Sequence, residues 1–322
     1  MSKLIKLSVS IVIPNYNGEQ LLVETISCAY KALDTSGIVD YEIIVSDDAS
    51  TDESFHQATS IFPELIFIKS DVNTGFAGNM NRGISRATKE LVCFLNSDVH
   101  LSSGYFSSQL SLFQDEQTFG VMGAILDKQT NEPQDGAKNP HIGLLKIESN
   151  KNTFSATQVL PTLFLSGANA LVRRKHLLEL GGFCELFNPY YSEDVDLGLQ
   201  AWRNGWSLYF QPTSICYHEQ SSTIKKLPNN KVKIIAKRNK HFLHFLHLPS
   251  GLNWAYLAKA LIQSFAHLLV GKTLHLKAFF LVFKEFKSLR LERKNRREKT
   301  PNKKLLSVFQ VKEAIDGKVP LK

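Results

Sequence analysis

This chain has few cysteines, and their wide spacing argues against both a disulfide framework and a cysteine zinc site. The 322 residues contain four cysteines, far apart and without a Cys-x-x-Cys pair: Cys28, Cys93, Cys184 and Cys216. A disulfide framework or a cysteine zinc site needs paired spacings, so we expect buried free thiols in a reducing compartment. The segment Met1–Lys6 is too short, before the first apolar run, for a secretory signal. We therefore expect a cytoplasmic protein.

Acidic residues are nearly absent from the last third of the chain. Residues 224–322 hold 23 Lys and Arg but 5 Asp and Glu, whereas the first 223 residues hold 15 and 25. An acidic body with a strongly basic tail indicates two roles. A long uninterrupted apolar run is also lacking, because Leu252–Val270 contains Asn253, Lys259 and His267. This stretch is therefore a poor transmembrane span.

Short apolar runs that end in polar turns recur through the first hundred residues. We expect strands over Leu7–Ile13, Tyr41–Val45, Leu65–Ile68 and Leu91–Leu95. Each of the first three strands is followed by a segment that we expect to be helical. These helices cover Glu19–Leu33, a stretch after Asp52 that ends at Ile61, and a stretch from Asn73 to about Ala87. This alternation indicates βαβ crossovers and a parallel sheet. The carboxyl ends of such strands share one edge, so the loops rich in Asn and Asp that follow them should converge on one crevice.

The second half of the sequence continues with mixed elements. We expect strands over Phe119–Leu126, Leu163–Val172, Ser207–Phe210 and Ser214–Tyr217. We expect helices over Ser102–Asp115, Arg173–Leu180 and Glu193–Asn204, the last capped by Ser192. The polar segment 128–160 is expected to form a loop or hairpin near the site.

The apolar run Cys93–Leu95 ends abruptly in Asn96-Ser97-Asp98. Asp98 and Asn96 could present oxygen ligands to a hard divalent cation. A solvated loop after a core strand would have the same composition, so this short motif needs its context.

Five blocks, in order, resemble glycosyltransferase family 2 and together cover roughly residues 7–222. They are Ile11–Gly18, Val45–Asp52, Asn73–Gly83, Phe94–Asp98 and Gly181–Trp206. The blocks are similar to those of rhamnosyltransferases in this family. The resemblance implies an α/β protein of GT-A type. Its Rossmann-like, mostly parallel sheet would be flanked by helices, with a helical basic extension at the C-terminus. It also implies a nucleotide-sugar donor, a divalent metal and an inverting displacement at the anomeric carbon.

The resemblance also assigns residues to the donor and metal sites. The nucleotide pocket would comprise Pro14, Tyr16, Asn17, Asp47, Asp48, Asn79, Arg82, Asn96 and Ser97. Asp47 would hydrogen-bond the pyrimidine base, while Arg82 could instead be a surface residue of its helix. Asp98 would bind Mg²⁺ or Mn²⁺, with His218 completing the metal shell or contacting the diphosphate. Asn96 replaces the first acidic residue of the family's D-x-D motif, which leaves one charged ligand in it.

For the general base the resemblance favours Asp194, with Glu193 and Asp196 as alternatives. Asp196 is expected to cap or to form an ion pair within the fold. The first turn of a helix lowers the basicity of a carboxylate through the macrodipole, whereas burial raises it. Gln200 stands where the family often has Arg, a role that Arg203 could take. Cys184 stands where Asp is common.

The basic tail combines helical spacing with aromatic residues. A helix is expected over Lys231–Leu248 and another over Leu274–Leu289, before the charged run Arg290–Lys299. Aromatic residues flanked by Lys and Arg favour interfacial helices on an anionic leaflet. The alternative is a helical subdomain packed on the body. The sequence contains no evident stacking platform of the kind that would indicate specific nucleic-acid binding.

We therefore expect a catalytic domain over residues 1–223, divided into a nucleotide-sugar half (1–100) and an acceptor half (101–223). A helical basic region (224–299) that contacts an anionic membrane surface and a flexible tail (300–322) would follow. The expected function is metal-dependent, inverting transfer of rhamnose or another hexose. The donor would be a UDP- or dTDP-sugar, and the acceptor a glycan or lipid-linked surface polysaccharide on the cytoplasmic face of the inner membrane.

Two alternatives stay open. One is a nucleotidyltransferase, although the loop Pro14–Gly18 lacks the cation that a phosphate loop would carry. The other is a non-catalytic membrane- or polyanion-binding module. Removing residues 224–322 is expected to separate membrane binding from donor turnover.

Overall fold

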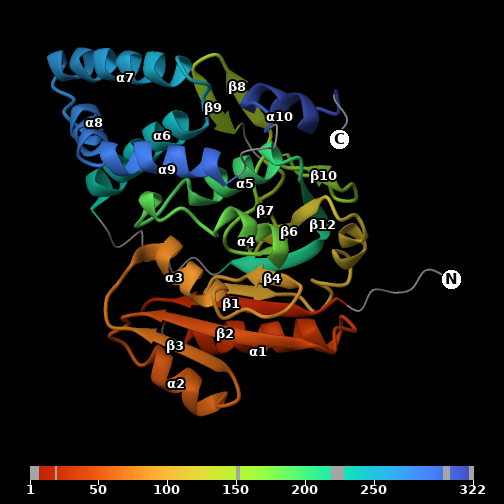
Figure 1. The fold of residues 1–322 in the computed structure, drawn as a ribbon. Coiled ribbons are helices and arrows are strands. Elements are labelled where there is room, and N and C mark those ends of the chain that lie inside the picture. The colour runs from red at the N-terminus through yellow and green to blue at the C-terminus, as the bar shows by residue number, and fades with distance from the viewer. Residues whose placement is uncertain (1–6, 19, 150–152, 219–227, 300–304, 319–322) are drawn as a thin grey trace.

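A large mixed sheet runs through the molecule, with strand order β10-β12-β6-β11-β4-β1-β2-β3 (Figure 1). The structure is a computed structural model that describes residues 7–18, 20–149, 153–218, 228–299 and 305–318. Its first half contains β1 (Val9–Asn15), α1 (Leu21–Asp34), β2 (Tyr41–Asp48), α2 (Ser54–Ile61), β3 (Ile66–Ser70), α3 (Gly75–Ile84) and β4 (Leu91–Phe94).

Strands β1 to β4 are parallel, as the repeated strand and helix pattern predicts. Side chains alternate across β1, with Ile11 and Ile13 in the core beneath α1 and Val12 in the core on the opposite face. Asn15 and Asp47 are register partners at the carboxyl ends of β1 and β2. The two polar loops that follow therefore begin side by side.

The acceptor half adds antiparallel strands and short helices. It contains β5 (Val99–Leu101), the 3₁₀ helix η1 (Leu110–Gln114), β6 (Thr118–Leu126), β7 (Pro133–Asp135), β8 (Pro140–Gly143), β9 (Lys146–Ser149), β10 (Leu160–Pro161), β11 (Ala170–Arg173), α4 (Arg174–Leu180), the 3₁₀ helix η2 (Glu185–Phe187), α5 (Glu193–Arg203) and β12 (Ser207–His218). Strands β8 and β9 form the hairpin expected within segment 128–160.

Three element predictions were wrong in this half. The strand expected from Leu163 begins only at Ala170, because a turn closed by the Asn169 N–H and the Ser166 carbonyl precedes it. The helix expected over Ser102–Asp115 is a series of turns that ends in η1. The two strands expected after Ser207 form one strand, β12, with a bulge that accommodates the interruption.

The C-terminal helices stack on the side of the sheet away from β3 (Figure 1). They are α6 (Asn229–His247), α7 (Leu252–Leu269), α8 (Leu274–Lys284), α9 (Phe286–Glu298) and α10 (Val308–Ile315). Phe242, Leu289 and Val308 belong to the same core cluster as Val12 and Phe94 of the sheet. The charge composition therefore changes near residue 223, but the segments on both sides share one hydrophobic core. None of the described helices combines the length and apolarity that crossing a bilayer requires.

Within the described residues 305–318, helix α10 contradicts the expectation of a flexible tail. Val308, Val311 and Ile315 are buried at helical spacing, and α10 packs against α5 and β8. Ser307 and Gln310 form a capping box at its start.

A buried ion pair joins α5 to the C-terminal helices. Arg296 contacts both carboxylate oxygens of Asp196, at 2.7 and 2.9 Å, and His247 Nε2 lies 2.7 Å from Asp196 Oδ1. Gln200 donates a further hydrogen bond to Asp196 at 3.0 Å. Burial alone would raise the pKa of Asp196, but Arg296 and His247 outweigh it and hold that pKa at about 2. The expectation of an ion pair at Asp196 is confirmed.

Replacing Arg296 with Met should destabilise the fold by about 3–5 kcal/mol, because Asp196 would remain buried without its charge partner. The lowered pKa means that the pair contributes fully above about pH 4 and loses its contribution as the pH falls toward 2. Urea unfolding of both proteins should therefore show a difference at pH 7 that shrinks in acid. Lys294→Met, which breaks an exposed pair with Glu298, is the matched control. Equal effects of the two substitutions would contradict this account.

Candidate functional site

The loops after β1 and β2 are fastened together by the carboxylate of Asp47, which is fully buried. It accepts hydrogen bonds from Asn15 Nδ2 at 2.7 Å, Ser50 Oγ at 2.6 Å and Ser50 N at 3.0 Å. Asn17, in the left-handed region with φ 53°, donates its N–H to Ser50 Oγ and accepts from the N–H of Thr51. Asn17 and Asp47, both predicted for the nucleotide pocket, thus belong to one rigid pair of loops.

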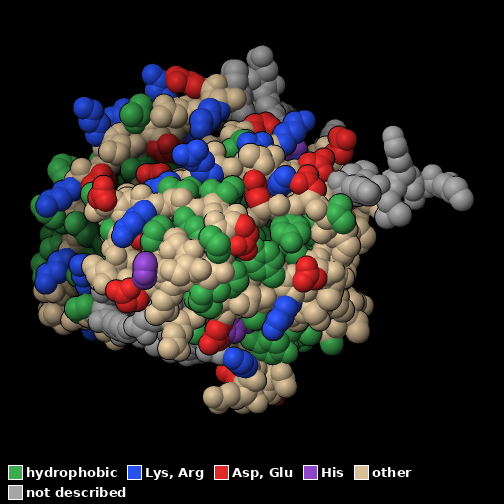
Figure 2. Space-filling model, turned by 90° about the horizontal axis from the view of Figure 1, so that it is seen from below, with side chains coloured by type: hydrophobic (Ala, Val, Ile, Leu, Met, Phe, Trp, Pro, Cys, Tyr) green, Lys and Arg blue, Asp and Glu red, His purple; other side chains and the backbone are tan. Residues whose placement is uncertain are grey.

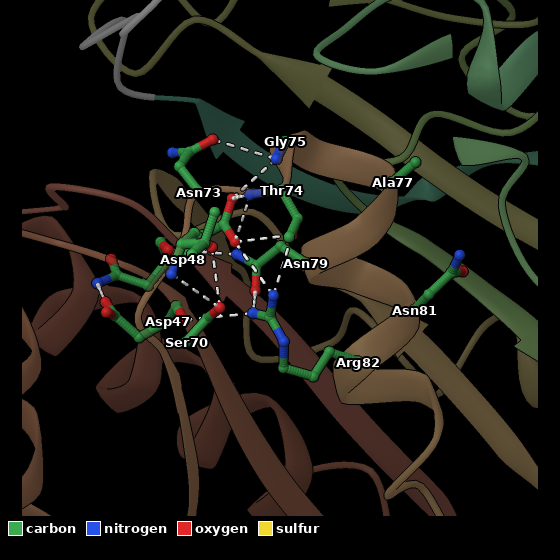
Figure 3. A network of polar contacts seen from close by, with 12 residues as sticks. Asp47, Asp48, Ser70, Asn73, Thr74, Gly75, Ala77, Asn79, Asn81 and Arg82 are labelled. Atoms are coloured by element: carbon green, nitrogen blue, oxygen red, sulfur yellow. Dashed lines mark hydrogen bonds and ion pairs between the residues drawn. The ribbon is translucent and has the colours of Figure 1, made fainter. Parts of the chain in front are cut away.

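The neighbouring Asp48 fixes the start of α3 (Figure 3). Its carboxylate accepts from the backbone N–H groups of Thr74 and Gly75 at 2.9 Å each. Arg82 reaches back from the end of α3 to within 3.3 Å of Asp48 and donates to Asn79 Oδ1 at 3.0 Å. Asp48, Asn79 and Arg82 are therefore engaged with one another. We interpret them as the framework of the pocket, and their direct contact with a nucleotide stays a prediction.

The other residues predicted for the nucleotide differ in exposure. Pro14 is buried in β1, whereas the ring of Tyr16 is 39% exposed beside it. Ser97 is half-buried, and its carbonyl accepts from Thr25. The amide oxygen of Asn96, Oδ1, is buried and has no hydrogen-bond partner among the residues the structure describes. Such an orphaned acceptor is suited to a ligand that brings a donor or a cation.

Asp98 and His218 lie together although 120 residues separate them in the sequence. His218 Nε2 is 3.2 Å from Asp98 Oδ2, and both side chains are partly exposed. The contact arises because β5 pairs with β12, with Val99 opposite His218. A carboxylate, an imidazole and the amide oxygen of Asn96 are donors that Mg²⁺ or Mn²⁺ accepts. The described residues contain no group of three or more His, Cys, Asp or Glu side chains that could hold a metal. A cation here would thus need ligands from substrate or water.

The backbone before α5 is held in an unusual conformation. Tyr191 and Ser192 both have φ 76°, a left-handed conformation that is costly for residues with side chains. Ser192 occupies the N-cap position, but its side chain accepts no capping hydrogen bond, so the cap predicted from the sequence is wrong. Glu193 and Asp194 follow at once, in the first turn of α5.

The environment of these two carboxyl groups favours their neutral forms. Burial raises the pKa of Asp194 to about 6, against the opposing effects of the Val195 N–H and the Lys138 ammonium. Burial and the charge of Asp194 raise the pKa of Glu193 to about 8. Burial thus outweighs the helix N-terminus, which resolves the competition that the sequence left open.

Two residues of α6 hold the loop before α5, and sequence reasoning missed their role. Asn239 is fully buried, and its Nδ2 donates to the carbonyls of Phe187, Tyr190 and Tyr191 at 2.6 to 2.9 Å. Arg238 donates to the carbonyl of Asn188. A polar Asn on the apolar face of a helix was the available signal. Removal of residues 224–322 would release this loop, so truncation cannot separate the two expected roles.

The two halves of the catalytic region meet at the carboxyl edge of the sheet. Asn188 Oδ1 accepts from the Ala77 N–H at 3.2 Å, which ties the loop before α5 to the start of α3. Asp194 and Phe94, near the end of β4, line the same small cavity of about 10 Å³. The loop before α5 and the Asp48 carboxylate at the end of β2 therefore meet at the start of α3.

Known proteins resemble this chain in sequence and in fold. The model of glycosyl transferase family 2 matches residues 10–181, more than half of the chain. The GalNAc(5)-diNAcBac-PP-undecaprenol beta-1,3-glucosyltransferase of Campylobacter jejuni is 25% identical over 253 residues, covering 76% of this chain and 73% of the relative. The N-acetylglucosaminyl-diphospho-decaprenol L-rhamnosyltransferase of Mycobacterium tuberculosis is 23% identical over 261 residues, covering 72% and 84%.

Other relatives are much longer than the matched region. The chain is 27% identical to the chondroitin synthase of Escherichia coli over 242 residues, 66% of this chain but 34% of that enzyme. Among solved structures, GalNAc-T7 with UDP, GalNAc and Mn²⁺ superposes with a TM-score of 0.54 at 15% identity, covering 74% of this chain and 51% of the other. This likeness supports the fold alone and confirms the predicted GT-A type architecture.

Replacing Asn239 with Ala should loosen the loop before α5, because its three carbonyl acceptors would lose their shared donor. Amide hydrogen exchange over residues 187–192 should accelerate by about tenfold or more, while exchange over the loops after β1 and β2 stays unchanged. Asn229→Ala, at the exposed start of the same helix, is the matched control. Unchanged exchange in Asn239→Ala would show that the loop holds its shape without this side chain.

Proposed function

Because the chain belongs to glycosyl transferase family 2, we propose that it transfers a hexose from a nucleoside diphosphate to a glycan acceptor. The structural observation that supports this proposal is the Asp98–His218 pair, which the pairing of β5 with β12 brings together across 120 residues of sequence. The donor would be a UDP- or dTDP-sugar, with rhamnose among the candidate sugars. A lipid diphosphate-linked acceptor is supported by the names of the Campylobacter and Mycobacterium relatives.

The nucleotide would lie over the loops after β1 and β2. The exposed ring of Tyr16 can stack on a base, and the Asp47 carboxylate can accept from its imide N–H. Asn15 and Ser50 already donate to Asp47, so the base would share its oxygens with them. This arrangement would align the base with an anchored loop pair instead of a mobile one.

Asp98 and His218 would hold Mg²⁺ or Mn²⁺, with the orphaned Asn96 Oδ1 as a further donor. When bound, the cation would offset the negative charge that develops on the leaving nucleoside diphosphate. The protein side chains would fix the position of the diphosphate relative to α5.

Asp194 would act as the general base of an inverting transfer. It would take the proton of the acceptor hydroxyl as that oxygen attacks the anomeric carbon opposite the leaving diphosphate. A pKa of about 6 keeps Asp194 ionised at neutral pH yet more basic than an exposed carboxylate. The raised pKa of Glu193 would lower the negative charge beside Asp194 that faces the diphosphate. The nucleotidyltransferase alternative gains no support, because the loop after β1 carries no cation.

A donor screen tests the proposed activity. The purified protein with Mn²⁺ should release nucleoside diphosphate from at least one UDP- or dTDP-sugar, and a chelator should abolish the release. Asp98→Asn should lower the rate by about 100-fold, because it removes the charged ligand. Asp34→Asn, which changes an exposed carboxylate at the C-terminal end of α1, before β2 begins, is the control. No turnover of any such donor with lipid-linked or free glycan acceptors would contradict the proposal.

Substituting Asp194 with Asn should reduce transfer by about 100-fold or more while leaving UDP or dTDP affinity, measured by calorimetry, close to that of the wild type. The wild-type rate should fall as the pH drops through about 6, because protonated Asp194 cannot accept the hydroxyl proton. An equal loss of transfer and nucleotide affinity would place Asp194 in the pocket or the scaffold. A rate that is flat from pH 5 to 8 would exclude it as the base.

A further inference from the structure

Helix α7 is apolar on both of its faces. Tyr256, Leu257 and Ala260 are buried against the body, and Tyr256 stacks on His244 of α6 with ring centroids 4.1 Å apart. The opposite side exposes large apolar side chains at helical spacing: Trp254, Ile262, Phe265 and Leu269. Ile262 is 69% exposed and Leu269 is 89% exposed. The helix is therefore held to the protein by one face and presents the other to the surroundings.

Helix α8 extends this surface. Ala278 and Val282 are buried against the neighbouring helices, whereas Phe280 and Phe283 are 57% and 73% exposed. We call the exposed apolar residues of α7 and α8 the α7–α8 face. Isolated apolar side chains are common on protein surfaces, but six large ones on two adjoining helices form a patch that indicates an interaction site.

The charge around the α7–α8 face has one sign. Residues 220–284 contain 11 Lys and Arg and no Asp or Glu. Lys259, Lys272, Lys277 and Lys284 are all exposed. At the left edge of Figure 2, where α8 lies in Figure 1, hydrophobic and basic side chains are interspersed. A second copy of this chain would bring the same positive charge against itself, so self-association is disfavoured.

An open pocket of about 310 Å³ adjoins this face, between the start of α6 and the turn before α8. Asn230, Lys272, His275 and Lys277 line it, and Lys237 Nζ lies 2.9 Å from His275 Nδ1. Burial and neighbouring cations lower the pKa of both Lys237 and His275, which indicates a positive local potential. The pocket is therefore suited to a phosphate group beside an apolar layer.

We propose that the α7–α8 face docks on an anionic lipid surface, with its apolar side chains among the acyl chains and a lipid phosphate in the adjoining basic pocket. Aromatic and aliphatic residues beside Lys are the composition of helices that lie in a membrane interface. Figure 1 shows the carboxyl ends of β1 and β2 on the same side of the molecule as α8. Docking would thus bring the site toward the lipid, which would serve a lipid-linked acceptor if the proposed function holds.

Vesicle sedimentation of the full chain tests this inference. The wild type should bind vesicles that contain about one-third phosphatidylglycerol more strongly than vesicles of phosphatidylcholine alone. Ile262→Glu/Phe265→Glu should lower the bound fraction by about tenfold or more, because it places charge in the apolar layer. The control Val39→Glu/Ile61→Glu makes the same change at exposed apolar residues remote from the face and should bind like the wild type. Lys272→Gln/Lys277→Gln should remove most of the preference for phosphatidylglycerol.

Circular dichroism and nucleoside diphosphate release on a water-soluble acceptor establish that each variant is folded, and Phe280→Glu/Phe283→Glu provides a second test of the face. Failure of the wild type to bind either vesicle, or equal losses in the control, would overturn the inference. Light scattering that shows a dimer dissolved by Ile262→Glu/Phe265→Glu would assign the face to a second copy instead. Donor turnover without vesicle binding contradicts docking alone, whereas binding without turnover contradicts the proposed function alone.

Discussion

The buried carboxylate of Asp196 constrains the position of everything around it. A charge without solvent must be paired, and the partners that satisfy it come from α9, through Arg296, and from the end of α6, through His247. Asp196 lies two residues after Asp194, so the same ion pair that fastens the C-terminal helices also fixes the first turn of α5. The basic tail is therefore part of the scaffold of the site. The basic composition of the tail reflects its outer surface, whereas the buried contacts with Asp196 attach it to the body of the protein.

The site itself is assembled from two kinds of carboxylate. Asp47 and Asp48 are buried, and each accepts several hydrogen bonds that hold the surrounding loops in place. Asp98 keeps solvent access beside His218, whereas burial raises the pKa of Asp194. Hydrogen-bonded loops around the accessible Asp98 suit a reaction in which charged groups must be positioned before any bond changes. Asn239 extends this arrangement by holding the strained backbone that precedes Asp194.

Local pattern was sufficient for the first half of the fold. Apolar runs followed by polar turns identify the strands that end at Asn15, Asp48 and Phe94, and the parallel topology then requires their ends to lie along one edge. The sequence could not show that Arg296 pairs with Asp196, because a hundred residues intervene and many basic residues compete for the role. Nor could it decide the pKa of Asp194, which depends on burial contributed by distant elements. The helix α10 was missed because its few apolar residues stabilise it only through contacts with α5 and β8.

A structure of the protein with a nucleoside diphosphate and Mn²⁺ would test the central claim most directly, namely that the carboxylates at this edge serve one donor. Our account predicts a cation bound by Asp98 and His218, the diphosphate bridging to it, and the base against Tyr16 and the loops held by Asp47. A nucleotide bound at another edge of the sheet, or a cation that contacts neither Asp98 nor His218, would contradict it.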